Sequence, residues 1–224
     1  MRVEGFGPGG SARPAGAVTD RRTPPSVVPV DLTALVISSG WASGINAYAT
    51  VAVLGLLARF GDTDVVPAAL GRTDVLVVAT VMFCVEAVVD KVPWLDSLWD
   101  TLSTVVRPLV GAVVAAQLAG GADPDRQVLL AALGGGTALA SHGVKAGVRL
   151  AVNTSPEPFS NGIVSTVEDA SVVGVLALAV AHPWWALGVS ATLLLVGVLV
   201  VLLTWRLVRS AWTQRQAGTS TPNG

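Results

Sequence analysis

Long apolar blocks separated by short polar segments dominate the pattern of this chain. A transmembrane helix needs about 20 consecutive, mostly apolar residues, and six stretches approach that length. They cover residues 32–58, 75–92, 104–119, 128–152, 163–181 and 184–203. The pattern therefore predicts an all-α fold, a polytopic transmembrane helix bundle of about six spans. The predicted membrane domain covers residues 31–206, and residues 1–30 and 207–224 are expected to be disordered cytoplasmic tails.

Two connections between these spans have unusual patterns. Residues 93–107 have helical periodicity, with Trp94, Leu98 and Leu102 on one face and Asp96, Asp100 and Arg107 on or near the other. We predict a separate short amphipathic helix between spans two and three, which lies on the membrane or re-enters it. The second connection, residues 153–162, contains two prolines and several small polar residues. This composition predicts an ordered hairpin loop and not a regular helix.

Composition supports a membrane protein and excludes several other classes. Only 13% of the residues are charged, whereas a soluble domain usually carries about 25%. A net charge of −1 leaves no basic face for a nucleic acid. The single cysteine, Cys84, lies in an apolar run and is expected to be a small buried apolar residue. No nucleophile elbow, zinc-binding HExxH or CxxC motif occurs in the sequence, so neither an enzyme nor a cofactor is predicted.

The distribution of basic residues predicts the orientation. Under a six-span count, the loops and termini on one side carry more than three times as many basic residues as those on the other. The first set is Arg13, Arg21, Arg22, Lys91, Arg107, Lys145, Arg149, Arg206, Arg209 and Arg215, and the second is Arg59, Arg72 and Arg126. Because cytoplasmic loops are rich in Lys and Arg, the prediction places both termini on the cytoplasmic side.

Ionisable residues inside the predicted spans mark the candidate site. Such residues cost several kcal/mol when they are exposed to lipid, so they need partners or water. The predicted topology brings them together in the cytoplasmic half of the bundle. Carboxylate and amide oxygens suit hard cations such as Mg²⁺ or Mn²⁺, which makes Glu86, Asp90, Glu168 and Asp169 the candidate metal ligands. The full set of binding or transport candidates is Asn46, Glu86, Asp90, Lys91, Asp96, Asp100, Arg107, His142, Lys145, Arg149, Glu168 and Asp169.

Two functions fit this cluster of charges. We favour a transporter or channel-like protein for a small cation or a polar solute, with the lipid bilayer as its surroundings and no nucleic-acid partner. The alternative is a non-transporting scaffold whose charges form structural ion pairs. Such a protein could also be a subunit that binds anionic lipid headgroups through Arg107, Lys145 and Arg149.

Several of these segments resemble a known family. They are SGINAYAT (Ser43–Thr50), DKVPWLDSLWD (Asp90–Asp100), RP (Arg107–Pro108), SHGVKAGVRLAVNTSPEPFSN (Ser141–Asn161) and ED (Glu168–Asp169). Together they resemble the bacterial integral membrane proteins grouped as domain of unknown function 4126, over about residues 31–186. The resemblance implies a location in the bacterial cytoplasmic membrane and implies no particular activity.

Overall fold

Helices form nearly all of the structure. The computed structural model describes residues 30–153 and 158–218, and these contain no β-strand, so the all-α prediction is confirmed. In chain order, the elements are α1 (Val30–Ile45), α2 (Ala47–Phe60), the 3-10 helix η1 (Ala68–Gly71), α3 (Thr73–Val89), α4 (Pro93–Leu118), α5 (Pro124–Asn153), α6 (Pro158–Ala181) and α7 (Pro183–Gly218).

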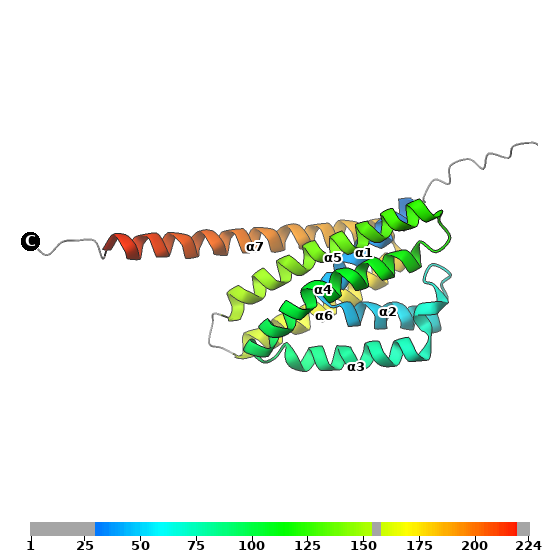
Figure 1. Cartoon of the computed structure of the whole chain (residues 1–224), viewed down its shortest axis with the longest axis horizontal. Coiled ribbons are helices and arrows are strands. Elements are labelled where there is room, and N and C mark those ends of the chain that lie inside the picture. Colours follow the sequence, from blue (N-terminus) through cyan, green and yellow to red (C-terminus); the bar gives the residue numbers. More distant parts are fainter. Residues whose placement is uncertain (1–29, 154–157, 219–224) are drawn as a thin grey trace, which may run out of the picture.

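The helices α3 to α7 run along the length of the bundle in alternating directions, whereas α1 and α2 do not form one rod (Figure 1). Gly40 packs against Gly134, and Gly44 packs against Ala138 and Ser141, so α1 runs parallel to α5. The chain then reverses at Asn46. Arg59 donates to Thr73 over 2.9 Å, which places the end of α2 beside the start of α3.

The prediction that residues 32–58 form one membrane-spanning helix is therefore wrong. It is a helical hairpin whose two arms meet near the middle of the bundle (Figure 1). As a result, the start of α1 and the end of α7 lie at opposite ends of the bundle (Figure 1). The sequence prediction instead places both termini on one side of a membrane.

The separate short helix predicted at residues 93–107 is also wrong. This segment is the first part of α4, a continuous helix of 26 residues that also contains predicted span three. Proline in its first turn costs no hydrogen bond there, and Pro108 is accommodated inside the helix. Although proline removes one backbone donor from a helix, helices at membrane depth tolerate it where neighbouring groups satisfy the freed backbone.

Two helix boundaries also differ from the sequence prediction. The predicted loop over residues 153–162 is shorter, because α5 continues to Asn153 and α6 already begins at Pro158. The helix α7 continues to Gly218, past residue 207, where the sequence predicts a disordered tail. The N-terminal tail is predicted over residues 1–30. Residues 1–29 lie outside the described residues, as do residues 154–157 and 219–224, and Val30 is the first residue of α1.

Small residues let the central helices approach closely. A side chain at Gly40 would meet the carbonyl oxygen of Gly134, and a side chain at Gly44 would overlap Ser141 and Ala138. In addition, Gly111 faces Ala138 and Gly134, which brings α4 against α5 in the same layer. Close backbone approach through small residues is how membrane helices commonly pack. The close approach packs α1 against both α4 and α5, which also contact each other.

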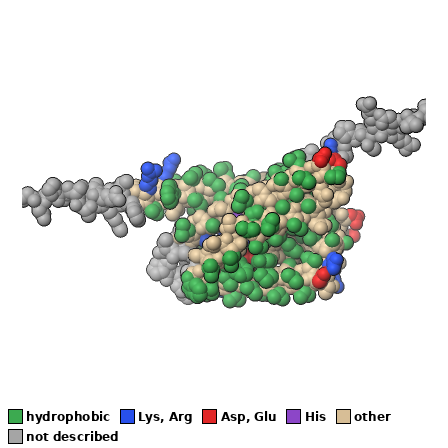
Figure 2. Space-filling view, viewed as in Figure 1, with side chains coloured by type: hydrophobic (Ala, Val, Ile, Leu, Met, Phe, Trp, Pro, Cys, Tyr) green, Lys and Arg blue, Asp and Glu red, His purple; other side chains and the backbone are tan. Residues whose placement is uncertain are grey.

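The outer surface of the bundle is apolar. Hydrophobic side chains cover most of the visible face, whereas most of the charged side chains in this view gather at the two ends of the long axis (Figure 2). Among the described residues, three helical segments are long and apolar enough to cross a membrane, namely Trp94–Leu118, Gly162–Ala181 and Pro183–Ser210. The number of six spans is not confirmed. Cys84 is exposed on this surface and not buried as predicted.

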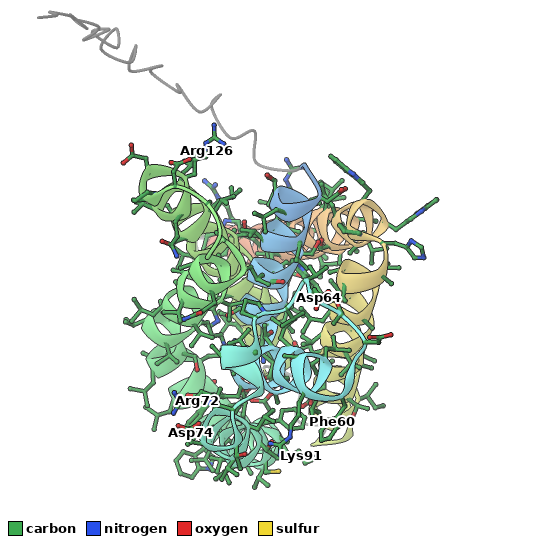
Figure 3. The ribbon with its side chains drawn as sticks, turned by 90° about the vertical axis from the view of Figure 1, so that its right-hand side faces the viewer. Phe60, Asp64, Arg72, Asp74, Lys91 and Arg126 are labelled. Carbon is green, nitrogen blue, oxygen red and sulfur yellow. The ribbon has the colours of Figure 1, made fainter. Side chains whose placement is uncertain are left out.

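The end of the bundle seen in Figure 3 carries Phe60, Asp64, Arg72, Asp74 and Arg126. Arg72 and Asp74 lie beside each other there, with Nη2 of Arg72 2.7 Å from Oδ2 of Asp74. This hydrogen bond lowers the pKa of the exposed Asp74 carboxyl. Buried charged residues such as Glu86, Lys145 and Arg149 lie elsewhere, between the middle of the bundle and its other end.

Candidate functional site

The polar face of α4 points into the bundle and its apolar face points out. Trp94, Leu98 and Leu102 are 68%, 55% and 61% exposed, whereas Asp96 and Asp100 on the opposite face are buried. Residues 93–107 therefore form an amphipathic helix as predicted. In contrast to a helix of a soluble protein, the apolar face points outward and the polar face points into the bundle. Lipid can cover the apolar face, so the acidic face must find its partners among the other helices.

Lys145 on α5 is surrounded by oxygens from three other helices. Its Nζ lies 2.9 Å from the carbonyl oxygen of Ile45, 3.3 Å from Oε2 of Glu168 and 3.5 Å from Oδ2 of Asp90. A fourth oxygen, Oε1 of Glu86, lies 3.9 Å away. An ammonium group has three N–H donors, so it cannot donate to all four. Its position makes Lys145 the centre of the buried charge cluster.

Arg149 lies one turn further along α5 and connects three acidic residues. It binds Glu168 through both carboxylate oxygens, with Nε to Oε1 at 3.2 Å and Nη2 to Oε2 at 2.6 Å. Its Nη2 also lies 3.1 Å from Oδ2 of Asp90, and its Nη1 lies 3.5 Å from Oδ1 of Asp96. Bidentate pairing of this kind fixes orientation as well as charge. Arg149 thereby joins α3, the start of α4 and α6.

Arg107 on α4 holds the cluster at its other end. Its Nη2 lies 2.5 Å from Oε1 of Glu86, and its Nη1 lies 3.3 Å from Oδ1 of Asp100. The same Nη1 lies 2.8 Å from Nδ1 of His142 and 3.3 Å from the carbonyl oxygen of Gly44. The side chains of Arg107 and Glu86 are each 1% exposed. Removing one partner of such a buried pair leaves an uncompensated charge.

The C-terminal end of α1 and the N-terminal end of α2 both lie at this cluster of buried charges. The last carbonyls of α1, at Gly44 and Ile45, accept hydrogen bonds from Arg107 and Lys145. This placement is favourable because a helix C-terminus carries partial negative charge. Asn46 begins α2, with its Oδ1 accepting from the Ala49 N–H over 2.8 Å. Its Nδ2 donates to Oδ1 of Asp169 over 2.9 Å, so one residue caps a helix and binds an acid on α6.

Eleven of the twelve candidate residues come together in this way, and Lys91 does not. Lys91 is exposed in the turn after α3, and its ammonium donates to the carbonyl oxygen of Ala87 in that helix over 2.6 Å. Its position one residue after Asp90 turns it about 100° away from the face that carries Glu86 and Asp90. The cluster therefore contains one cation fewer than the sequence analysis assumed.

Sequence reasoning did not include several polar groups that complete the site. Ser43 Oγ donates to the carbonyl oxygen of Arg107 over 3.1 Å, and Thr104 Oγ1 lies 3.1 Å from Nε2 of His142. Ser43 lies one position before the Gly44 carbonyl that Arg107 binds. Thr104 lies four residues after Asp100 on the acidic face of α4, a spacing that could have indicated it. The carbonyls of Gly44 and Ile45 carry no sequence signal, because any residue supplies a carbonyl.

The cluster lies within a region that matches a known protein family. A model described as Domain of unknown function (DUF4126) matches residues 33–205, which include all the residues of the cluster. The chain belongs to this family. No curated protein and no solved structure matches the chain.

In this chain, the four candidate metal ligands contact positively charged or amide side chains. Within residues 30–153 and 158–218, no three His, Cys, Asp or Glu side chains are grouped so that they could hold a metal ion. Glu86 and Asp90 instead contact Arg107, Lys145 and Arg149, Glu168 contacts Lys145 and Arg149, and Asp169 contacts Asn46. A divalent cation bound to Glu86, Asp90 or Glu168 would therefore have to compete with a fixed cation for the same carboxylate.

Proposed function

We propose that this protein is an integral membrane protein that binds and moves a small cation or a polar solute through the buried charge cluster. The observation that carries the proposal is the α1–α2 hairpin, whose open helix ends meet the cluster near the middle of the bundle. Discontinuous helices at mid-membrane form the binding sites of many secondary transporters. Helix ends at that depth are tolerated only where protein or a polar cavity satisfies them.

The charges are also arranged in a way that allows rearrangement. Lys145 has more acceptors within 4 Å than it has N–H donors. Arg107 contacts two carboxylates, and Arg149 contacts three. A bound solute or ion could therefore replace one partner of a charged side chain while another partner remains in contact with it. A set of purely structural ion pairs does not need these additional partners.

We further propose a bacterial cytoplasmic membrane as the location, with the C-terminus in the cytoplasm. Arg206 and Arg209 near the end of α7 support this side, because cytoplasmic segments are rich in Lys and Arg. The reversal at Asn46 supports an N-terminus on the opposite side, in place of the two cytoplasmic termini expected from sequence. Labelling of single cysteines in a Cys84→Ser background tests this. Asp31→Cys and Ala122→Cys should react from one side, and Arg209→Cys from the other.

Flux into proteoliposomes tests the activity. Purified protein would be assayed with a panel of cations, with a pH-sensitive dye and with small polar solutes. Empty liposomes and Lys145→Gln protein serve as controls. We expect flux with the natural sequence and at least a tenfold lower rate with the variant. Absence of flux across the panel, together with anionic lipid recovered on purification, would support the scaffold or lipid-binding function instead.

The lipid-binding alternative has less support from geometry. Arg107, Lys145 and Arg149 are 1%, 3% and 1% exposed, and each contacts carboxylates. A headgroup phosphate would have to reach buried cations and compete with those carboxylates.

A further inference from the structure

The buried cluster contains more acids than bases. Among the described residues, six carboxylates meet three permanent cations: Glu86, Asp90, Asp96, Asp100, Glu168 and Asp169 against Arg107, Lys145 and Arg149. Lys91 points away, and His142 accepts a hydrogen bond from Arg107 and therefore brings no charge. If every carboxyl group were ionised, the cluster would carry three uncompensated negative charges in a water-poor interior. Like charges at close range oppose each other's ionisation.

Two oxygens in the cluster identify where the excess lies. Oε2 of Glu86 and Oδ1 of Asp90 are buried and have no hydrogen-bond partner among the described residues. Oδ1 of Asp96 and Oδ1 of Asp100 differ from them, because each lies within 3.5 Å of an arginine nitrogen. Glu86 is 0% exposed and Asp90 is 2% exposed. A buried polar atom without a partner costs about 1–3 kcal/mol, and more if it is charged. Each of these oxygens belongs to a carboxyl group whose other oxygen contacts a cation.

The carboxyl groups of Glu86 and Asp90 lie on the same helix face and contact the same cation. They lie four residues apart on α3, a spacing that places side chains on one helix face about 5–6 Å apart at Cβ. Both contact Lys145, at 3.9 Å from Glu86 and 3.5 Å from Asp90. A charge gained or lost at one of them is therefore felt by the other and by Lys145.

A proton fits these two oxygens better than a metal ion does. Mg²⁺ requires about six oxygen ligands in near-octahedral geometry, and the described residues offer no such group. Arg107 and Lys145 already lie beside Oε1 of Glu86, so a dication bound to this carboxylate would be close to two fixed cations. A proton needs only one lone pair, and it removes one of the excess charges without moving any side chain.

We propose that Glu86 and Asp90 form a proton-binding pair, which shares at least one exchangeable proton on the oxygens that have no other partner. In the binding step, one O–H bond forms on a carboxylate oxygen, with hydronium as the donor and water as the other product. Release is the reverse reaction. The proposal rests on the function proposed above and makes the proton the ion, or one of the ions, that the cluster carries.

Infrared spectroscopy of the purified protein tests this pair directly. A protonated carboxyl group that is shielded from water has a C=O stretching band distinct from that of a carboxylate, and the band shifts in D₂O. We expect this band in the natural sequence near neutral pH, and its loss or shift in Glu86→Gln, in Asp90→Asn or in both. Asp74→Asn, on the same helix but exposed, is the matched control and should leave the band unchanged.

Three results would overturn the proton pair. They are absence of the band from acidic to alkaline pH, an unchanged band in both variants, or a stoichiometric divalent cation that is lost in both. If Glu86→Gln does not fold, the natural sequence and Asp90→Asn still decide the matter. The band requires no transport, so the two proposals fail separately. An assigned band without flux would refute only the transport function, whereas flux without the band would refute only the proton pair.

Discussion

The guanidinium of Arg107 determines the protonation state of His142, because its Nη1 lies 2.8 Å from Nδ1 of the imidazole. Arginine can only donate, so Nδ1 must be the acceptor and the proton must be on Nε2. Nε2 then donates to Thr104 Oγ1 over 3.1 Å, and the hydroxyl of Thr104 in turn donates a hydrogen bond to the carbonyl oxygen of Asp100 over 3.0 Å. The ring is thus neutral and serves to position Arg107.

The first prediction follows from this arrangement. Nitrogen-15 NMR of labelled protein should show His142 as the Nε2–H tautomer, with His182 available as an internal comparison. Substitution by Gln, which can accept from Arg107 and donate to Thr104, should be tolerated better than substitution by Leu. Leu should lower the free energy of unfolding by about 1–3 kcal/mol, because it leaves Arg107 without one acceptor. An imidazolium signal at neutral pH would contradict the assignment.

The second prediction concerns the unequal number of acids and bases. Lys145→Gln and Arg149→Gln should each lower stability by about 3–5 kcal/mol, because each strands several carboxylates. Glu86→Gln and Asp90→Asn should cost less, about 1–2 kcal/mol, because an amide resembles the protonated acid and Arg107 keeps Asp100 as a partner. Thermal unfolding in detergent measures the difference. Equal losses for acids and bases would mean that the cluster is an ordinary set of balanced ion pairs.

The third prediction separates the two roles of Asn46. Asn46→Ser keeps a side-chain acceptor for the start of α2 but loses the donor to Asp169. Asn46→Ala loses both, and loss of the cap alone should cost about 0.5–2 kcal/mol. We expect Ser to be more stable than Ala, and both to be impaired in flux. If Ser and Ala unfold at the same temperature, the cap contributes nothing to the hairpin.

The fourth prediction compares two glycines at the α1–α5 contact. Gly44→Ala would push a methyl group into Ser141 and Ala138 and should cost about 1–3 kcal/mol. Gly143→Ala on α5 meets nothing within 4 Å, so it should be neutral or stabilise the helix by up to about 1 kcal/mol. The difference between the two melting temperatures is the measurement. A destabilising Gly143→Ala would show that another surface covers this position.

The charged site was largely predictable, because its information is local. The spacing of four residues places Glu86 and Asp90 on one helix face, and the same spacing places Lys145 and Arg149 on another. Ionisable groups in an apolar span must also face other helices, because lipid does not solvate them. The reversal at Asn46 was not predictable in the same way. Residues 32–58 contain no proline and no charged residue, and nothing in their periodicity marks a break. The open ends are stabilised by Arg107, Lys145 and Asp169, which lie far away in the sequence.

The continuity of α4 was missed for a related reason. Pro93 and Pro108 divide residues 93–118 into what resembles a short amphipathic helix followed by a span. In the structure, the acidic face of the first part is satisfied by Arg107 and Arg149, so the helix can enter the bundle from its first turn. Sequence periodicity identifies two faces of a helix, but it does not say which face meets lipid and which meets protein.

The length of α7 offers a practical advantage. At about 1.5 Å per residue, its 36 residues extend for about 54 Å, whereas a bilayer core is only about 30 Å thick. The last turns must therefore leave the lipid unless the helix is strongly tilted, and Figure 1 shows them well beyond the other helices. A second protein fused in unbroken helical register after Arg209 would be held as a rigid fiducial for electron microscopy. The same extension would serve as a fixed arm for distance measurements by spin labels.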